Sequence, residues 1–221
     1  MNLYKFQTIN NLSLEGLIKH SLYFARTDQL NDPTEGMFAL EGHSKDLKKF
    51  GILSMTKGEP SQIENSPFMW AHYGNELKGF CLVFGFDSFV SSIESAVLFN
   101  GDVHYQSGRT LLDPLSSDQG PEPLSGVDHE VLRDKNMYRN LFFQKPKEFE
   151  NEREYRFITE KSDSLQYDKK SLSKIIIGER MESCDETVLL SVLGNLGLLN
   201  KVEYAFVQKD SFKIQIGKFF L

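Results

Sequence analysis

The sequence lacks several features that would assign it to a class of proteins. Among 221 residues there are two cysteines, Cys81 and Cys184, far apart in the chain. Cys81 lies inside an apolar run, so we expect a small core residue and no disulfide. No apolar run approaches the roughly 20 residues of a membrane-spanning helix, and the first residues do not resemble a signal peptide. We therefore expect a cytoplasmic protein with no membrane partner.

An excess of positive charge is also absent. The chain has 31 acidic residues against 25 Lys and Arg, which gives a formal net charge of -6. Counterion release from nucleic acid requires clustered Lys and Arg, so this balance argues against broad non-specific binding to nucleic acid or anionic membrane.

The common fingerprints of enzyme chemistry are missing as well. No glycine-rich phosphate loop is followed by Gly-Lys-Ser/Thr, and no Gly-x-Ser-x-Gly turn presents a serine nucleophile. The five histidines and two cysteines show no metal-ligand spacing. The sequence therefore predicts no metal site built from these residues.

What is present is material for a packed core, because 40% of the residues are hydrophobic and 18 are Phe. Extended and helical patterns follow one another without a regular βαβα order, which favours the α+β class over a doubly wound sheet. We expect one domain over residues 1–221, with a mixed, mainly antiparallel sheet and flanking helices. Residues 107–128 are rich in Gly, Pro, Ser and Asp without a clear period, so we predict a mobile loop there.

Three helix starts can be predicted from capping residues. Asn10 or Asn11 precedes a segment with helical spacing of leucines. Ser66 before Pro67 is typical of an N-cap with proline at the first helical position. Ser183, three residues before a glutamate, predicts a capping box for a helix that ends near Gly197.

Three short polar clusters lie far apart in the chain and suggest one assembled site: residues 31–35 (Asn-Asp-Pro-Thr-Glu), 69–73 (Met-Trp-Ala-His-Tyr) and 152–156 (Glu-Arg-Glu-Tyr-Arg). The first cluster is typical of a rigid turn in which Asp32 bonds backbone amides. A functional interpretation adds Glu35 as a carboxylate that faces a ligand, with Asn31 beside it.

The second cluster contains the only tryptophan, Trp70, on the short helix that Ser66 is expected to start. Trp70 and Tyr73 would share one face of that helix, and His72 would point elsewhere. They are either core residues or stacking residues for a base or nicotinamide ring, with His72 donating a hydrogen bond. Stacking on a base is worth about 1–3 kcal/mol, enough to matter for a nucleotide ligand.

The third cluster is predicted to enter a strand over residues 155–159. Period two would place Glu152, Glu154 and Arg156 on one face. Two carboxylates and one guanidinium on a buried face are costly unless they are paired. The alternatives are a solvated strand edge, structural ion pairs, or a polar cleft in which a carboxylate engages a ligand hydroxyl.

The three clusters together resemble a bacterial family of proteins of unknown function, some of whose members are described as AbiGi-type abortive phage resistance proteins. The resemblance extends from about Leu3 to Gly178 and includes Tyr4 on the first expected strand. It implies a role in phage defence and no established reaction.

A second resemblance is to mono-ADP-ribosyltransferases, through Ser54-Met55-Thr56 and Glu152-Arg153-Glu154. It implies a split-sheet fold, NAD as cofactor, and a protein or nucleic-acid acceptor. By this resemblance Glu154 grips the ribose 2′-hydroxyl of NAD, and Glu152 orients the acceptor. Ser54 and Thr56 would support NAD. Further residues assigned near the cofactor or its acceptor are Tyr4, Trp70, His72 and Tyr73.

These observations leave three functions open. The first is an NAD-using ADP-ribosyltransferase or NAD-cleaving effector in phage defence. The second is a non-catalytic module that senses a phage protein or nucleotide through the residues around Trp70. The third is a metal-dependent nuclease with Asp32, Glu35 and Glu152 as ligands.

Overall fold

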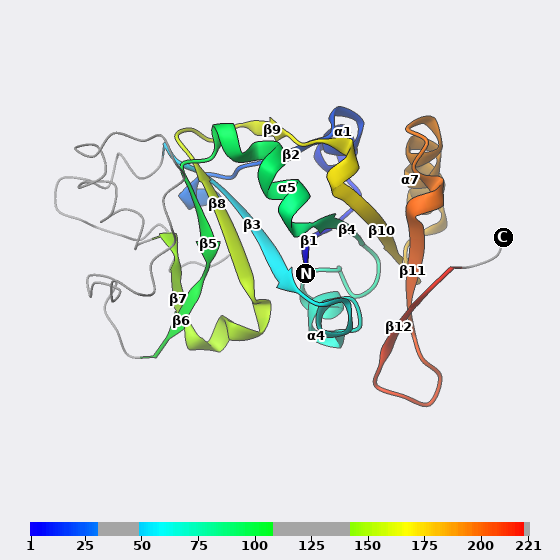
Figure 1. Ribbon diagram of the computed structural model, residues 1–221. Coiled ribbons are helices and arrows are strands. Elements are labelled where there is room, and N and C mark those ends of the chain that lie inside the picture. Colours follow the sequence, from blue (N-terminus) through cyan, green and yellow to red (C-terminus); the bar gives the residue numbers. More distant parts are fainter. Residues whose placement is uncertain (31–48, 108–141, 219–221) are drawn as a thin grey trace, which may run out of the picture. The chain divides into compact units, whose positions relative to one another are not determined.

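A computed structural model describes residues 1–30, 49–107 and 142–218 (Figure 1). The candidate residues Asn31, Asp32 and Glu35 lie outside the described residues. So does the loop predicted at 107–128, apart from Ser107.

The described residues form short helices and strands. The α-helices are α1 (Asn11–Lys19), α3 (Pro60–Ile63), α4 (Pro67–His72), α5 (Phe86–Ile93) and α7 (Ser183–Asn195). The strands are β1 (Asn2–Gln7), β2 (Ser21–Tyr23), β3 (Gly51–Gly58), β4 (Phe80–Gly85), β5 (Phe99–Asp102), β6 (His104–Gln106), β7 (Gln144–Pro146), β8 (Glu154–Thr159), β9 (Ser164–Gln166), β10 (Leu172–Gly178), β11 (Val202–Val207) and β12 (Ile214–Gly217). The 3₁₀ turns are η1 (Thr27–Gln29), η2 (Glu94–Ala96), η3 (Lys147–Glu152), η4 (Lys169–Ser171) and η5 (Leu199–Lys201).

Most of these strands belong to one mixed, open sheet with the order β12-β11-β10-β4-β1-β3-β8-β5. In this sheet the pairs β1-β3, β1-β4, β4-β10, β11-β12 and β5-β8 are antiparallel, whereas β10 and β11 run parallel. The predicted α+β class with a mainly antiparallel sheet is therefore confirmed. Two further pairs, β2-β9 and β6-β7, form separate two-stranded sheets.

By compactness the chain divides into two units. Unit 1 comprises Met1–Ser21, Thr56–Ser92 and Gln166–Leu221, and unit 2 comprises Leu22–Met55 and Ile93–Leu165. The prediction of a single domain over residues 1–221 stays a prediction. Each unit is described by itself below.

Unit 1 is organised around β4, which pairs with β1 and with β10. Residues from Phe80 to Phe84 are all buried, as expected for an apolar run at the centre of a sheet. Cys81 is fully buried among them, so its prediction as a core residue is confirmed. One face of this part of the sheet packs Tyr4, Val83 and Ile176 against Trp70 of α4.

Unit 2 contains the antiparallel pair β5 and β8 and the beginning of β3 next to β8. A hydrophobic cluster of four phenylalanines and two isoleucines lies in its core, with Phe50, Ile52, Phe99, Phe142, Phe143 and Ile158 all buried. All six residues of β8 are buried, including Glu154 and Arg156. The parallel pair β6-β7 places Tyr105 in register with Lys145.

Two of the three predicted helix starts are confirmed. The Asn10 side chain accepts a bond from the Ser13 amide at 2.9 Å, and Ser66 caps the helix that begins at Pro67. The third prediction is wrong in detail, because the cap of α7 is Glu182, whose side chain makes no capping hydrogen bond. Ser183 is already the first helical residue, so its hydroxyl is not in the cap position. Within the described ranges, no helix combines the length and apolar character needed to cross a membrane.

Candidate functional site

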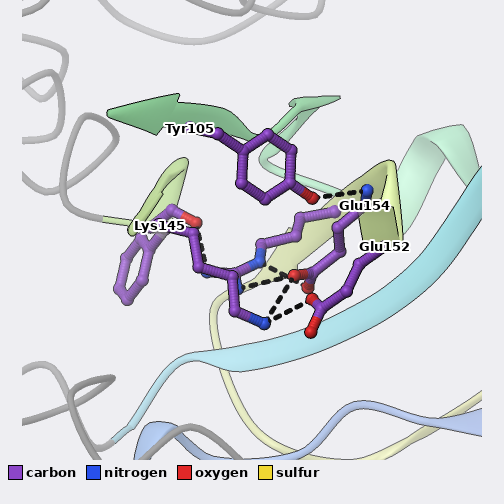
Figure 2. A network of polar contacts seen from close by, with 6 residues as sticks. Tyr105, Lys145, Glu152 and Glu154 are labelled. Atoms are coloured by element: carbon purple, nitrogen blue, oxygen red, sulfur yellow. Dashed lines mark hydrogen bonds and ion pairs between the residues drawn. The ribbon is translucent and has the colours of Figure 1, made fainter. Parts of the chain in front are cut away.

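Four charged side chains meet inside unit 2, and we refer to Lys145, Glu152, Glu154 and Arg156 as the charged cluster (Figure 2). Lys145 comes from β7, Glu152 from the last position of η3, and the other two from β8. The four side chains are between 2% and 8% exposed. Ionised groups this buried require partners, since each loses its hydration.

The local backbone explains how the two glutamates come together. Arg153 follows η3 with φ 48° and ψ 48°, a left-handed conformation that ends the turn and lets β8 begin at Glu154. Glu154 and Arg156 are two residues apart on the strand and point to the same face, as the alternation predicted. Glu152 reaches the same cluster from the 3₁₀ turn, so strand alternation is not the reason for its position.

Arg156 grips Glu154 with two hydrogen bonds. Its Nε donates to Oε1 at 2.7 Å and its Nη2 donates to Oε2 at 3.0 Å. Nη1 of the same guanidinium donates to the Phe142 carbonyl at 2.7 Å. Such a bidentate pair fixes the orientation of the carboxylate as well as its charge.

Lys145 bridges the two glutamates. Its ammonium donates to Glu152 Oε2 at 2.6 Å and to Glu154 Oε2 at 3.3 Å, and it lies 4.7 Å from the centre of the Phe149 ring. Figure 2 shows the lysine approaching both carboxylates. The sequence analysis missed Lys145. A charge count could have found it, because two buried carboxylates and one guanidinium leave one negative charge that needs a second cation.

Glu154 is ionised at neutral pH in this setting. Burial alone would raise the pKa of its carboxyl group. The Arg156 charge and its hydrogen bonds oppose this, with help from Lys145 and from a hydrogen bond with Ser54, and the resulting pKa is about 2. Charge pairing therefore outweighs desolvation at this residue.

The resemblance to mono-ADP-ribosyltransferases assigned Ser54 and Glu154 to one site, although 100 positions of sequence separate them. The structure brings them together: Ser54 is half-buried on β3, its side chain is hydrogen-bonded to Glu154, and β8 is the neighbouring strand. Thr56, the other residue of that element, is buried and belongs to unit 1.

Tyr105 supplies a further polar contact that the sequence analysis did not identify. Its hydroxyl oxygen accepts a bond from the Glu154 amide at 2.8 Å (Figure 2). Burial raises the pKa of Tyr105 well above its usual value, so this hydroxyl keeps its proton at neutral pH. This hydrogen bond fixes the backbone of Glu154, the first residue of β8.

The aromatic candidates belong to unit 1. Trp70 is 1% exposed, and its ring N–H donates to the Glu64 carbonyl at 2.7 Å. Phe6 packs edge-on against it at 5.1 Å. The Tyr4 hydroxyl donates to the buried Glu64 carboxylate at 3.4 Å. Trp70 and Tyr4 are therefore core residues whose polar atoms are bonded to Glu64.

The remaining two aromatic candidates are more accessible. His72 is exposed, with its ring 4.6 Å from that of Phe68. Tyr73 follows α4 and is partly buried against the core of unit 1. Of the four aromatic candidates, His72 has the most accessible side chain for a ligand.

A second buried carboxylate organises unit 1, and we refer to Glu64, Lys174 and Glu203 with Tyr4 as the Glu64 cluster. Lys174 donates to Glu64 at 2.9 Å and lies 3.1 Å from Glu203. Burial lowers the pKa of Lys174, but its bonds to the two glutamates more than offset this, and the pKa is raised. Lys174 is 26% exposed, so this ion pair has access to water.

The chemistry available in unit 2 follows from these contacts. An ionised, oriented carboxylate can stabilise a developing positive charge, and the adjacent lysine and glutamate can position a polar partner. Among the described residues, no three His, Cys, Asp or Glu side chains are arranged to hold a metal ion.

Comparisons with known proteins give one result. Neither the curated proteins nor the solved structures contain a match to this chain. The matched span begins at Met69 on α4 and ends at Phe157 on β8, and it includes Trp70 and all four members of the charged cluster. Residues 69–157 match the family described as "Protein of unknown function (DUF2971)", which supports a family of domains of unknown function for this part of the chain.

Proposed function

We propose that the charged cluster is the catalytic centre of an NAD-cleaving enzyme, which transfers ADP-ribose to an acceptor or to water. The observation that carries this proposal is the pairing of Ser54 with an ionised Glu154 across neighbouring strands. Both residues belong to the two elements through which the chain resembles mono-ADP-ribosyltransferases.

The reaction breaks the bond between the nicotinamide nitrogen and ribose C1′. Nicotinamide leaves with the bonding electrons, and the sugar acquires oxocarbenium character, as in glycoside cleavage. A carboxylate near the ribose stabilises that positive charge, and a dry environment strengthens the attraction. Glu154 is suited to this role because its pKa of about 2 keeps it charged.

Hydrogen bonding sets the place of the substrate. Both oxygens of Glu154 already accept bonds from Arg156, and Oε2 also accepts one from Lys145. In the proposed complex, a ribose hydroxyl replaces the Ser54 hydroxyl as a donor to Glu154. The carboxylate then keeps its number of hydrogen bonds, and Arg156 keeps its orientation.

Glu152 and Lys145 are assigned to the acceptor side. Glu152 is the second carboxylate bonded to the Lys145 ammonium, at 2.6 Å. In this proposal Glu152 orients the nucleophile, and Lys145 fixes the spacing between the two carboxylates. The resemblance to phage-resistance proteins supports a defence role, in which NAD depletion or target modification halts the infected cell.

The test is nicotinamide release from NAD by the purified chain, with and without cell lysate. Glu154→Gln should lower the rate by roughly 100-fold or more, since it removes the charge that stabilises the transition state. Glu150→Gln is the control, because Glu150 is an exposed glutamate of η3, the 3₁₀ turn that comes shortly before β8. NAD-dependent stabilisation without turnover would instead indicate a sensor, and nucleic-acid cleavage abolished by EDTA would indicate the nuclease.

Folding of Glu154→Gln must be measured in parallel. Removing one partner of a buried ion pair costs about 3–5 kcal/mol, so a loss of activity could reflect unfolding. Ser54→Ala keeps every charge of the cluster and removes only a hydroxyl. It should change KM for NAD more than kcat, and a folded Glu154→Gln protein with undiminished turnover would refute the proposal.

A further inference from the structure

Two buried aromatic side chains of unit 1, His20 and Tyr167, lack the hydrogen bonds that buried polar groups normally make. His20 is 8% exposed and Tyr167 is 5% exposed. Three polar atoms, the two ring nitrogens of His20 and the hydroxyl oxygen of Tyr167, are shielded from solvent. Among the described residues, none of the three has a hydrogen-bond partner. More than about 90% of buried polar groups in proteins are bonded, so the exception calls for a physical explanation.

The two residues hold each other through backbone and ring contacts. The Tyr167 amide donates to the His20 carbonyl at 2.8 Å, and their ring centres are 6.0 Å apart at an angle of 82°. Tyr167 also packs against Phe84 at 5.0 Å and Phe89 at 6.2 Å. The imidazole therefore lies next to a ring whose other neighbours are apolar.

The backbone places His20 at a junction. It ends α1 in a left-handed conformation, with φ 49° and ψ 51°, and its amide donates to the Leu17 carbonyl at 3.2 Å. β2 begins at the next residue, and Tyr167 directly follows β9, the strand that pairs with β2. A change at this pair would therefore reach both short strands.

A neutral imidazole tolerates this environment better than a charged one. Protonation would give His20 two N–H donors with no acceptor and a buried charge that lacks hydration. Lys169 is the charged group that acts on His20, and its positive charge opposes protonation further. Tyr167 is the other titratable neighbour, and burial raises its pKa, so it stays neutral.

We propose that His20 and Tyr167 form a proton-operated latch that is closed while His20 is neutral. When His20 takes up a proton, the pair separates, the imidazolium becomes hydrated, and the adjoining ends of β2 and β9 loosen. This pH-dependent opening does not depend on the function proposed for unit 2.

The direction of the pH effect follows from linkage. Burial, and then the charge of Lys169, lower the pKa of His20 in the closed form below its ordinary value of 6.5. The hydrated open form keeps an ordinary pKa and binds the proton more readily. The equilibrium constant for opening should therefore rise by up to about tenfold per pH unit below about 6.5, and should be insensitive to pH above about 7.5.

Amide hydrogen exchange in the full chain tests the latch. Rates are measured at about pH 7.5 and about pH 5 and divided by the intrinsic rates at each pH. The reporter is the Tyr167 amide, which is bonded to His20. We expect its protection to fall by tenfold or more on acidification. Amides of the central strand β4 should change much less.

Two variants separate the latch from general acid sensitivity. His20→Asn suits the left-handed conformation and does not titrate, so the pH dependence at Tyr167 should disappear. His72→Asn, at an exposed position of the same unit, should retain it. An equal pH dependence in all three proteins would overturn the proposal.

A second measurement covers the case in which His20→Asn does not fold. The imidazole of His20 is titrated by NMR in the wild-type chain, with the Tyr167 ring signals followed in the same spectra. The latch requires that the Tyr167 signals shift together with the titration of His20. Titration of His20 with unchanged Tyr167 signals would overturn the proposal.

Discussion

The two units each bury a carboxylate, but they neutralise it in different ways. In unit 1, Glu64 is bonded by the hydroxyl of Tyr4 and by Lys174, which is 26% exposed. In unit 2, Glu154 and its charged partners are all between 2% and 8% exposed. The Glu64 cluster thus combines aromatic packing with a hydrated ion pair, whereas the charged cluster relies on mutual charge pairing.

That difference indicates which cluster is the better candidate for chemistry. Replacing a buried ion-pair network by apolar residues is often neutral or stabilising, so a network of four buried charges is weak evidence for a purely structural role. The Glu64 cluster, by contrast, explains why Trp70 and Tyr4 are buried, because both donate to Glu64. We therefore propose that the aromatic residues of unit 1 serve mainly the folded core and that the charged cluster carries the function.

The largest expected effect comes from Arg156→Met. It removes both bonds to Glu154 and, among the described residues, leaves Lys145 as the remaining cation bonded to that buried carboxylate. The free energy of unfolding should fall by about 3–5 kcal/mol, measured by urea denaturation. Lys147→Met, at an exposed position of η3, is the control and should change stability by less than about 0.5 kcal/mol. If the two variants were equally stable, the charged cluster would not depend on mutual charge pairing, and the distinction from the Glu64 cluster would fail.

The acid sensitivity of the charged cluster should be nearly as large. The pKa of Glu154 is lowered from 4.5 to about 2 in the folded chain, so its contribution is present above about pH 4.5 and is lost as the pH falls towards 2. At roughly 1.4 kcal/mol per unit, this contribution is about 3 kcal/mol. Unfolding measured across this range should show that loss, and Glu154→Gln should lack it. If Glu154→Gln lost as much stability as the wild type over this pH range, the loss could not be attributed to Glu154.

A smaller loss is expected in unit 1 from Glu64→Gln. The amide still accepts from Tyr4, but the ion pair with Lys174 becomes an ordinary hydrogen bond. We expect a loss of about 1–3 kcal/mol, with NAD turnover by the folded fraction unchanged. Loss of turnover without loss of stability would show that the Glu64 cluster also belongs to a site.

The smallest effect is expected from Tyr4→Phe. The bond from the Tyr4 hydroxyl to Glu64 is long, at 3.4 Å, so its removal should cost about 0.5–1 kcal/mol. The KM for NAD should not change if Tyr4 is a core residue only. An increased KM in a stable protein would support the contact with NAD that the resemblance implied.

The sequence predicted those parts of the fold that depend on local patterns. The apolar run around Cys81 predicted a buried residue, which lies on the central strand β4, and Asn10 and Ser66 predicted helix starts. The capping box at Ser183 was misplaced by one residue, because a serine before a helix can occupy either the cap or the first turn. Alternation on β8 correctly predicted that Glu154 and Arg156 share a face.

The candidate site was only partly predictable. Ser54 was found through its resemblance to a known element, but Lys145 was missed because its neighbours in sequence give no sign of its register with Tyr105. The fate of Trp70 was also undetermined, since a stacking residue and a core residue have the same local pattern. The ring N–H of Trp70 donates to the carbonyl of Glu64, six positions earlier, and no motif in the sequence connects these two residues.

Whether Glu154 acts on NAD can be decided by the rate of nicotinamide release by Glu154→Gln relative to Glu150→Gln, with both proteins shown to be folded under the assay conditions. If Glu154 is the catalytic carboxylate, we expect this ratio to be about 0.01 or less. A ratio near one would show that Glu154 does not act on NAD.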